Sequence, residues 1–467
     1  MTREDLAQLS KEALIDLILA QAEQIAALQE ALAQLKANYE ALRLKLEKGK
    51  KPPINSSNSS QPPSRDQKRS LPSDRLKRKH GPPVGHPKYE RKFVASPDHI
   101  VNVKAKTCTT CHADLHSTEG ALLDVNQITE LPPAKAEVIE VRQYVVNCPQ
   151  CGQIQATQPP AGLEMERTFG ARLEATVVYY RQEQHMSYQR TEEALWELHG
   201  VSISQGGIDQ IMQRAGQKAC QQTDAIQAEV CQSAVIHSDE TGSRVNGQNW
   251  WEWVFCTLTA VLHVIRFNRS SDVIQDVMGD HQAEVWVSDC LLAQLKSRAR
   301  QHQICLAHQI RNLQAVIDLY PTTFWARAMQ ALFRYTIHLH HQRDQLPPDQ
   351  FLAQVARVER LCDGLIQRSV TETNSSRLQR RYQKYRDCLF VCLHRTDVSP
   401  TNNVSERALR PSVIHRKVIG CFRSGWGAKA YAALASVIHT ASLSGVNAFD
   451  AIQSLFGLPA LPLPSEV

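Results

Sequence analysis

The sequence lacks any apolar run that could cross a membrane, because no stretch approaches the roughly 18 consecutive apolar residues that a spanning helix needs. Its N-terminal segment, MTREDLAQLSKEALIDLILAQ, also lacks a basic region followed by an apolar core and a small-residue cleavage site. These absences argue against a membrane protein and against a secreted one. We therefore expect a soluble, cytoplasmic protein that engages no membrane.

Acidic residues are scarce in one segment of the 467-residue chain, which has 53 Lys and Arg against 47 Asp and Glu and a formal net charge of +6. Between Lys48 and Lys106, 15 basic residues face only 4 acidic ones, so the remainder of the chain is net negative. Such a concentration of positive charge indicates a polyanionic partner. A solvated linker kept soluble by its charge is the alternative.

The 13 cysteines are odd in number, and four form two CxxC pairs, which favours metal binding in a reducing compartment over a disulfide framework. Strands expected at 100–105 and 138–146 run into these pairs. Each CxxC turn brings two sulfurs to one side of an ion, so four thiolates could enclose one tetrahedral Zn²⁺. Redox activity is the weaker alternative, since neither pair opens a helix. The predicted zinc ligands are Cys108, Cys111, Cys148 and Cys151.

The N-terminal part has a heptad pattern. Apolar residues alternate at steps of three and four, with one polar member, among good helix formers. This pattern predicts a coiled coil, with a helix packed on its own domain as the alternative. The seam comprises Ile18, Gln21, Ile25, Leu28, Leu32, Leu35, Tyr39, Leu42 and Leu46.

The following stretch, residues 49–92, is rich in Pro, Ser and Asn and almost without large apolar residues. Such a composition cannot bury enough surface to offset chain entropy, so it predicts a disordered basic tether.

Farther on, segments 170–200 and 204–215 have helical patterns with a break at His199-Gly200-Val201. Two helices joined in this way fit a DNA-binding helix-turn-helix, although a helical hairpin that packs on the next domain fits nearly as well.

Strand-like segments dominate from residue 233, with one helix expected at 270–278. Two of these strands are expected to end at an acidic residue. In the order of three strands, a helix and a fourth strand, the segment resembles a ribonuclease-H-like fold, in which strands one and four are adjacent. The expected strands are 234–238 ending at Asp239, 250–258, 261–267, 284–288 ending at Asp289, and 304–307.

Neighbouring carboxylates repel each other, and divalent cations between them relieve the repulsion. Magnesium or manganese held by oxygen ligands could activate an attacking oxygen and stabilise a leaving one at phosphorus. Asp239 and Asp289 would supply two acids, and Glu406, on a helix that starts near Ser399, a third. Strand alternation is expected to keep Glu240 out of this cluster. Taken singly, each acid could be a turn cap or a surface residue.

Several longer motifs follow one another along the chain. They are HSDETGSRVNGQNWWEWVF, VWVSDCLLAQ, CLAHQIRNL, TNNVSERALRP and GCFRSGWGAKAYAALASVIHTASLSGVNAFDAI. Taken together, these motifs resemble the insertion-sequence sixty-six family of DDE transposases. The resemblance implies the catalytic triad Asp239, Asp289 and Glu406, and Asn403 as a residue that orients Glu406 or a phosphate. This sequence differs in having Cys290-Leu291 where the family often has Gly-Tyr.

Basic residues near these acids are candidates for DNA or carboxylate contacts. His308 and Arg311 lie in the CLAHQIR motif, where His308 could also be a hydrogen-bonded core residue. Arg407 and Arg410 follow Glu406 at a spacing that suits phosphate contact, or a solvated basic face.

The sequence thus predicts a multidomain α+β DNA transposase of a bacterial insertion sequence that is homo-oligomeric through its coiled coil. Helper proteins are further candidate partners. A transposase-derived DNA-binding protein without catalysis and a nuclease that only hydrolyses remain the alternatives. The expected divisions are a coiled coil over 1–48, a disordered basic linker over 49–97, a zinc-binding module over 98–160, a helix-turn-helix-like region over 165–230, a ribonuclease-H-like catalytic domain over 231–445 with an all-helical insertion at about 309–395, and a C-terminal tail over 446–467.

Overall fold

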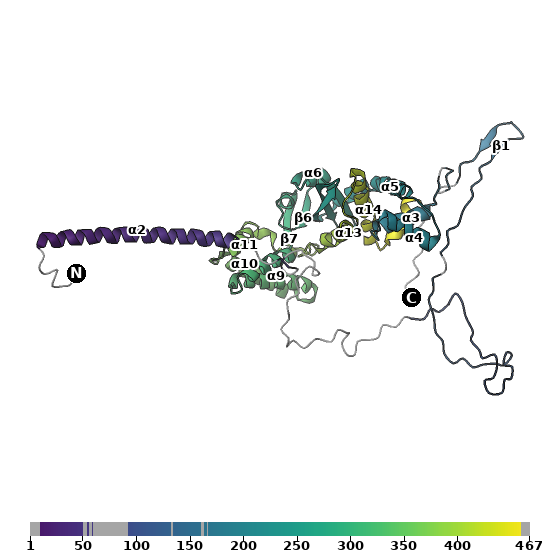
Figure 1. Ribbon diagram of the computed structural model, residues 1–467, viewed down its shortest axis with the longest axis horizontal. Coiled ribbons are helices and arrows are strands. Elements are labelled where there is room, and N and C mark those ends of the chain that lie inside the picture. Colours follow the sequence, from purple (N-terminus) through teal and green to yellow (C-terminus); the bar gives the residue numbers. More distant parts are fainter. Residues whose placement is uncertain are drawn as a thin grey trace.

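The computed structural model describes residues 10–49, 54–55, 58, 92–131, 134–159, 163–165 and 167–458. It has a long N-terminal helix, a central mixed body of sheet and helices, and an extended arm (Figure 1). No helix among these residues is long and apolar enough to cross a membrane.

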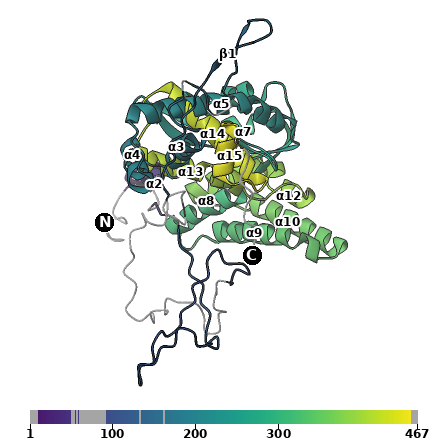
Figure 2. The same cartoon turned by 90° about the vertical axis from the view of Figure 1, so that its right-hand side faces the viewer.

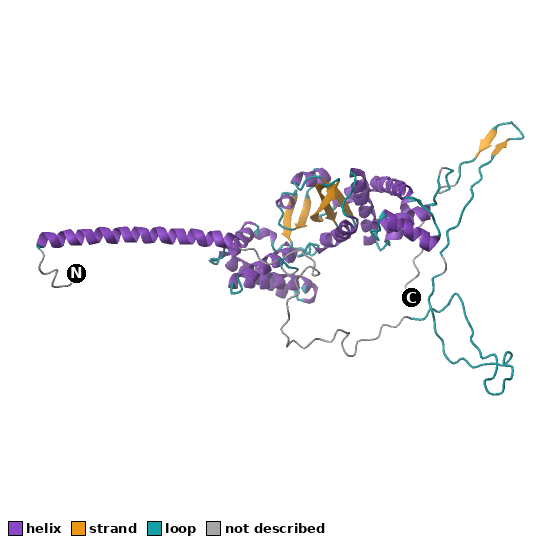
Figure 3. Cartoon of the chain, viewed as in Figure 1, coloured by secondary structure: helices purple, strands orange, loops and turns teal. Residues whose placement is uncertain are grey.

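The first helix, α2 (Lys11–Gly49), covers most of the expected heptad segment and projects away from the body (Figure 3). Its C-terminal end lies against α11 (Thr373–Lys384). The central seam residues Ile25, Leu28, Leu32, Leu35, Tyr39 and Leu42 are all exposed. The helical part of the prediction is therefore confirmed, and the coiled coil stays a prediction.

Most of the predicted disordered linker, 49–97, lies outside the described residues. Within it, Asn55 and Asn58 form a turn in which each backbone N–H donates to the other's side-chain oxygen. The Asn58 side chain is buried and donates to Asp318 Oδ2 at 2.8 Å. This part of the linker is therefore folded against the body.

The expected zinc module forms an arm with a single small hairpin, β1 (Val145–Asn147) paired antiparallel with β2 (Ile154–Ala156) (Figure 1). The expected strand at 138–146 is thus shortened to its end. The strand expected at 100–105 is absent from the described residues, where only a bridge between Thr107 and Asp114 forms. These segments pair with no wider sheet, so they lack the ladder that would extend them.

The central sheet has the order β5-β4-β3-β6-β7. Its first and fourth strands, β3 and β6, are neighbours, as expected. They pair in parallel, as do β6 and β7, whereas β3, β4 and β5 are antiparallel. The strands are β3 (Val235–Val245), β4 (Gln248–Cys256), β5 (Val261–Arg266), β6 (Ala283–Ser288) and β7 (Ala299–Ile304).

Two strand expectations are wrong. β3 does not end at Asp239, because its pairing with β4 continues through Val245 to a tight turn at Asn246-Gly247. The parallel pairing of β3 with β6 does stop at His237, so Asp239 lies just beyond that ladder. The fifth strand is β7 rather than 304–307, since Leu306 already begins a helix.

A group of helices from both sides of the insertion shares one core with the sheet. These helices are α3 (Ala171–Gln182), α4 (Tyr188–His199), α5 (Gln205–Gln232), α6 (Ser271–Met278), α14 (Gly425–Leu443) and α15 (Ala448–Leu455). α5 and α14 cross closely at Gly216, where an added Cβ would lie 2.4 Å from the Ala430 Cβ. The segment 446–467 is not simply a tail, because Ile452 and Leu455 of α15 are buried in this core. Nor do α3 to α5 have a core separate from the sheet.

The expected all-helical insertion is present between β7 and the helix that carries Glu406. It has its own core, which extends onto Val285 and Val287 of β6, and in Figure 2 its helices α9 and α10 lie below α5 and α14. The insertion comprises α8 (Leu306–Leu319), α9 (Phe324–His341), the short turn η2 (Arg343–Gln345), α10 (Pro348–Gln367), α11, η3 (Arg386–Cys388) and α12 (Val391–His394). After it come α13 (Asn403–Ile419) and α14, and a short helix, α7 (Leu292–Leu295), follows β6.

Candidate active site

Three carboxylates meet where the parallel strands end. Asp239 and Glu240 lie on β3, and Asp289 directly follows β6. One oxygen of each lies within 4.8 Å of one oxygen of each of the other two. The expectation that strand alternation excludes Glu240 is therefore wrong. The predicted convergence of Asp239 and Asp289, which are 50 residues apart in sequence, is present in the structure.

The electrostatics of Asp239 suit a site that holds cations. Burial raises the pKa of this carboxyl well above its usual value, and the negative charges of Glu240, Asp289 and Glu406 raise it further. A backbone hydrogen bond from the Glu240 N–H to Asp239 Oδ1, at 2.9 Å, only partly offsets these effects. Because oxygen ligands of like charge are held together here, the residues fit a hard divalent cation.

Glu240 differs from its neighbours in having partners within the protein. Its Oε1 accepts from Arg269, with Nε at 3.0 Å and Nη2 at 2.5 Å, and its Oε2 accepts from Gln294 at 2.9 Å. Gln294 is itself held by the indole N–H of Trp286. The side chain of Glu240 is 1% exposed. It therefore supports the cluster from beneath, while Asp239 and Asp289 lie nearer to solvent.

Glu406 is positioned by Asn402, the residue that precedes α13. Asn402 is fully buried, donates from Nδ2 to the Ser238 carbonyl at 2.8 Å, and accepts at Oδ1 from the Ser405 hydroxyl. Its backbone N–H donates to the Cys305 sulfur at 3.1 Å. These bonds join the start of α13 to β3 and to the end of β7. Asn403, the predicted orienting residue, is exposed instead.

Glu406 lies beside the three clustered acids rather than among them. Its Oε1 accepts from Arg311 Nη2 at 2.6 Å and lies 3.4 Å from His308 Nε2. Both basic residues thus lie beside a carboxylate of the predicted triad, and their roles toward DNA or the carboxylates stay a prediction. The charge of Glu406 nevertheless acts on Asp239, so all three predicted triad residues share one electrostatic environment. Burial, and then the charge of Arg311, lower the pKa of His308, which favours its neutral form.

The two other predicted arginines lie on the outer face of α13. Arg407 and Arg410 are both exposed and lie one helical turn apart. Arg416, farther along the same helix, is half-buried and donates to Thr241 Oγ1 at 3.1 Å. The first two are thus available for contact with a ligand, and the third helps to hold α13 on β3.

The four predicted zinc ligands form two similar turns. Cys108 and Cys148 each accept at their carbonyl an N–H four residues on, from His112 and Gly152, and both of these residues have positive φ, 59° and 70°. Backbone N–H groups of Cys111 and Thr110 lower the pKa of Cys108 to about 7, which favours the thiolate that binds zinc. The two turns therefore each offer two thiolates to a zinc ion. The ligands of one such ion would be Cys108, Cys111, Cys148 and Cys151.

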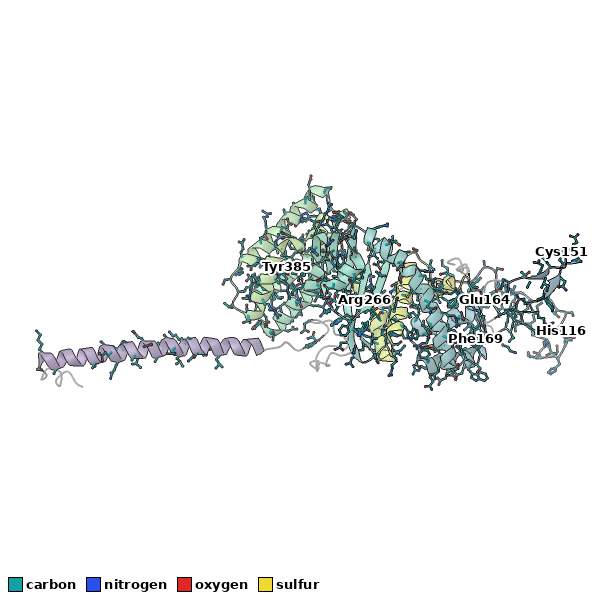
Figure 4. All side chains as sticks on the ribbon, turned by 90° about the horizontal axis from the view of Figure 1, so that it is seen from above. His116, Cys151, Glu164, Phe169, Arg266 and Tyr385 are labelled. Carbon is teal, nitrogen blue, oxygen red and sulfur yellow. The ribbon has the colours of Figure 1, made fainter. Side chains whose placement is uncertain are left out.

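The structure does not bring the two cysteine pairs together. Within the described ranges the acids Asp239, Glu240 and Asp289 form the one group of metal-ligand type. Cys151 and His116 lie at the arm's outer end, far from the insertion marked by Tyr385 (Figure 4). The joint zinc site stays a prediction.

Sequence reasoning missed Asn402 and Glu240. Asn402 has the residue type of a helix-start signal, and that signal could have identified it. Glu240 could have been kept as a candidate, because a glutamate side chain is long enough to reach the cluster although strand alternation starts it toward the opposite face. The role of Gln294, eight residues after Trp286, has no signal in the sequence.

A carboxylate cluster of this kind is the type of site that holds divalent ions in phosphatases, polymerases, nucleases and aminopeptidases. A family model described as "Transposase IS66 family" matches residues 166–430, and one described as "zinc-finger binding domain of transposase IS66" matches residues 105–152. The chain therefore belongs to the IS66 transposase family, and its second matched segment contains all four predicted zinc ligands. No curated protein matches the chain.

Proposed function

We propose that this chain is the DDE transposase of a bacterial insertion sequence, which cleaves the 3′ ends of its element and joins them to target DNA. The observation that carries the proposal is the meeting of Asp239 and Asp289 within metal-binding distance, with Glu406 close enough for its charge to act on Asp239. The strand order β5-β4-β3-β6-β7 supports a ribonuclease-H-like catalytic domain.

In this proposal Asp239 and Asp289 hold Mg²⁺ or Mn²⁺, with Glu406 as the third acid. When bound, a pair of such ions activates the attacking oxygen and stabilises the leaving one in an in-line displacement at phosphorus. Glu240 fixes the geometry through Arg269 and Gln294. No covalent protein intermediate is required, because water and then the freed 3′ hydroxyl are the nucleophiles.

The remaining parts of the chain would bind DNA and a second copy. Zinc held by the CxxC pairs would order the arm, and α4 and α5, joined at Gly200 and capped by Ser204, support a helix-turn-helix. The exposed seam of α2 supports a coiled coil between two chains. A DNA substrate and unpaired cysteines support action in the cytoplasm.

A strand-transfer assay tests the proposal, with a substrate that carries the inverted ends flanking the gene. We expect Asp239→Asn, Asp289→Asn and Glu406→Gln each to lower the Mg²⁺-dependent rate by about a thousandfold, because several kcal/mol of charge stabilisation are lost. Asp276→Asn, which changes an exposed acid of α6, is the matched control.

The assay also separates the alternatives. An unmodified chain that binds the ends but never cuts them is a DNA-binding protein derived from a transposase. A chain that cuts but never joins a 3′ end to a target is a nuclease. Either result would refute the proposed reaction.

A further inference from the structure

Helix α11 of the insertion has a stripe of positive charge on one face. Arg377, Arg380, Arg381 and Lys384 are spaced by three, four and seven residues, which places them on the same side of the helix. The twelve residues of α11 include no acidic side chain. Arg377, Arg380 and Lys384 are exposed, and Arg381 is partly exposed. We call these four residues the α11 stripe.

Nothing in the described part of the protein neutralises the α11 stripe. No salt bridge among the described residues includes any of its members. Arg380 donates only to the Ser376 carbonyl of its own helix, and Lys384 lies over the ring of Tyr385. Like charges one turn apart repel each other. An anionic partner would remove this repulsion.

The α11 stripe lies near the acidic cluster. α11 packs against α8, the helix that carries Arg311 and His308. The charge of Arg381 also acts on the Cys290 thiol, and Cys290 directly follows Asp289. Figure 4 places Tyr385, at the end of α11, within the insertion on the side away from the arm. A ligand along this face would therefore reach the site from the insertion side.

The chemistry of the exposed face identifies the partner. Its apolar residues Leu378 and Tyr382 are buried in the insertion core, so the solvent side of α11 is entirely polar. The buried core of a protein–protein interface is usually more apolar than the rest of the surface, and this face of α11 offers no apolar residue for such a core. The seven residue steps from Arg377 to Lys384 span about 10 Å, which corresponds to the rise of about three phosphates of one strand along the axis of duplex DNA, at about 3.4 Å each. The α11 stripe thus matches a phosphodiester backbone in both charge and length.

We propose that the α11 stripe binds the backbone of the DNA substrate and, together with Arg407 and Arg410 of α13, directs it across Asp239 and Asp289. The inference rests on the proposed function, because it assigns a DNA contact to the insertion of a DNA-cleaving enzyme. Contacts of this type carry charge rather than sequence information. The helical insertion is then part of the substrate site as well as a scaffold for α8.

The test measures binding of the full-length chain to a random-sequence duplex of about 30 base pairs as a function of salt, since this attraction is independent of sequence. All variants carry Asp239→Asn, so that cleavage does not interfere. The first triple variant is Arg377→Gln, Arg380→Gln and Lys384→Gln. The control triple is Arg334→Gln, Arg357→Gln and Arg360→Gln, which removes three exposed charges from α9 and α10 of the same insertion.

We expect the α11 triple to reduce the slope of log affinity against log salt by about 0.9 for each phosphate that the variant no longer neutralises, and to weaken binding about eightfold per such phosphate at 0.1 M salt. The control triple should leave the slope unchanged. A variant with Arg377→Lys and Arg380→Lys, in which Lys384 is unchanged, carries Lys at all three positions. It should keep most of the slope, because the positive charges are present. Lys384 in the Asp239→Asn parent should also be protected from acetylation when the duplex is bound.

An unchanged slope in the α11 triple, or an equal loss in both triples, would overturn the inference while leaving the proposed function standing. A parent chain that binds no DNA would overturn both. An α11 triple that binds DNA normally but loses self-association would show that the stripe contacts an acidic protein surface, and would also refute the inference.

Discussion

Replacing Asp239 by Asn should stabilise the chain in the absence of divalent ions. Its carboxylate lies within 4.8 Å of two other acids. Two unit charges at that distance repel by about 3.5 kcal/mol at an effective dielectric constant of about 20. Partial protonation relieves some of this repulsion, so we expect a net gain in unfolding free energy of roughly 1–3 kcal/mol near pH 8.

The sign of the pH dependence follows from the raised pKa of Asp239. The folded protein holds this proton more tightly than the unfolded chain does, so low pH favours the folded state of the unmodified protein over its unfolded state. It loses that stability as pH rises from the usual Asp value, 3.8, through the raised folded value. The advantage of Asp239→Asn over the unmodified chain should therefore grow with pH.

Thermal unfolding with and without Mg²⁺ measures both effects. Mg²⁺ at ten times its dissociation constant should stabilise the unmodified chain by about 1.4 kcal/mol, and Asp239→Asn should lose most of that gain. Asp276→Asn should behave like the unmodified protein. If Asp239→Asn were destabilising at pH 8 and both proteins responded equally to Mg²⁺, the reasoning about a repulsive cation site would be refuted.

Three further changes test other parts of the structure. Asn402→Ala should cost about 2–4 kcal/mol in unfolding free energy, because it leaves the Ser238 carbonyl and other buried groups unpaired, whereas the exposed Asn403→Ala should change stability by less than about 0.5 kcal/mol; equal effects would contradict the assigned roles. Leu32→Lys should turn a dimer into a monomer by light scattering, whereas Ala37→Lys, on the opposite side of the heptad, should not; a monomeric unmodified chain would dismiss the coiled coil. Cys148→Ser should abolish bound zinc in elemental analysis, and a full equivalent retained would contradict the predicted ligand set.

The order of elements and the positions of the acids could be predicted from local patterns. Apolar runs that end near Asp239 and Asp289 identified two central strands, and helical periodicity identified the insertion. Element ends were less predictable. β3 runs on to Val245 because its pairing with β4 continues, and a ladder with a distant strand leaves no signal at the position where a run of apolar residues stops.

The immediate surroundings of the site could not be predicted. Asn402 and Asn403 are adjacent residues of the same type, and only the packing of α13 on β3 decides which is buried. Glu240 is held by Arg269 and Gln294, which come from two other segments of the chain. Glu406 likewise meets Arg311 from a helix 95 residues away.

The sequence by itself determined which chemical groups the protein has and the local structures that present them: four cysteines in two turns, a heptad seam, and acids placed beside buried strands. These features depend on residues within a few positions of one another, so their spacing is sufficient to reveal them. Only the tertiary structure decided which carboxylates share a site, which asparagine positions Glu406, and where the charged face of α11 lies. Such contacts join residues that are far apart in the chain, and their energies depend on burial and mutual distance, which exist only once the chain has packed.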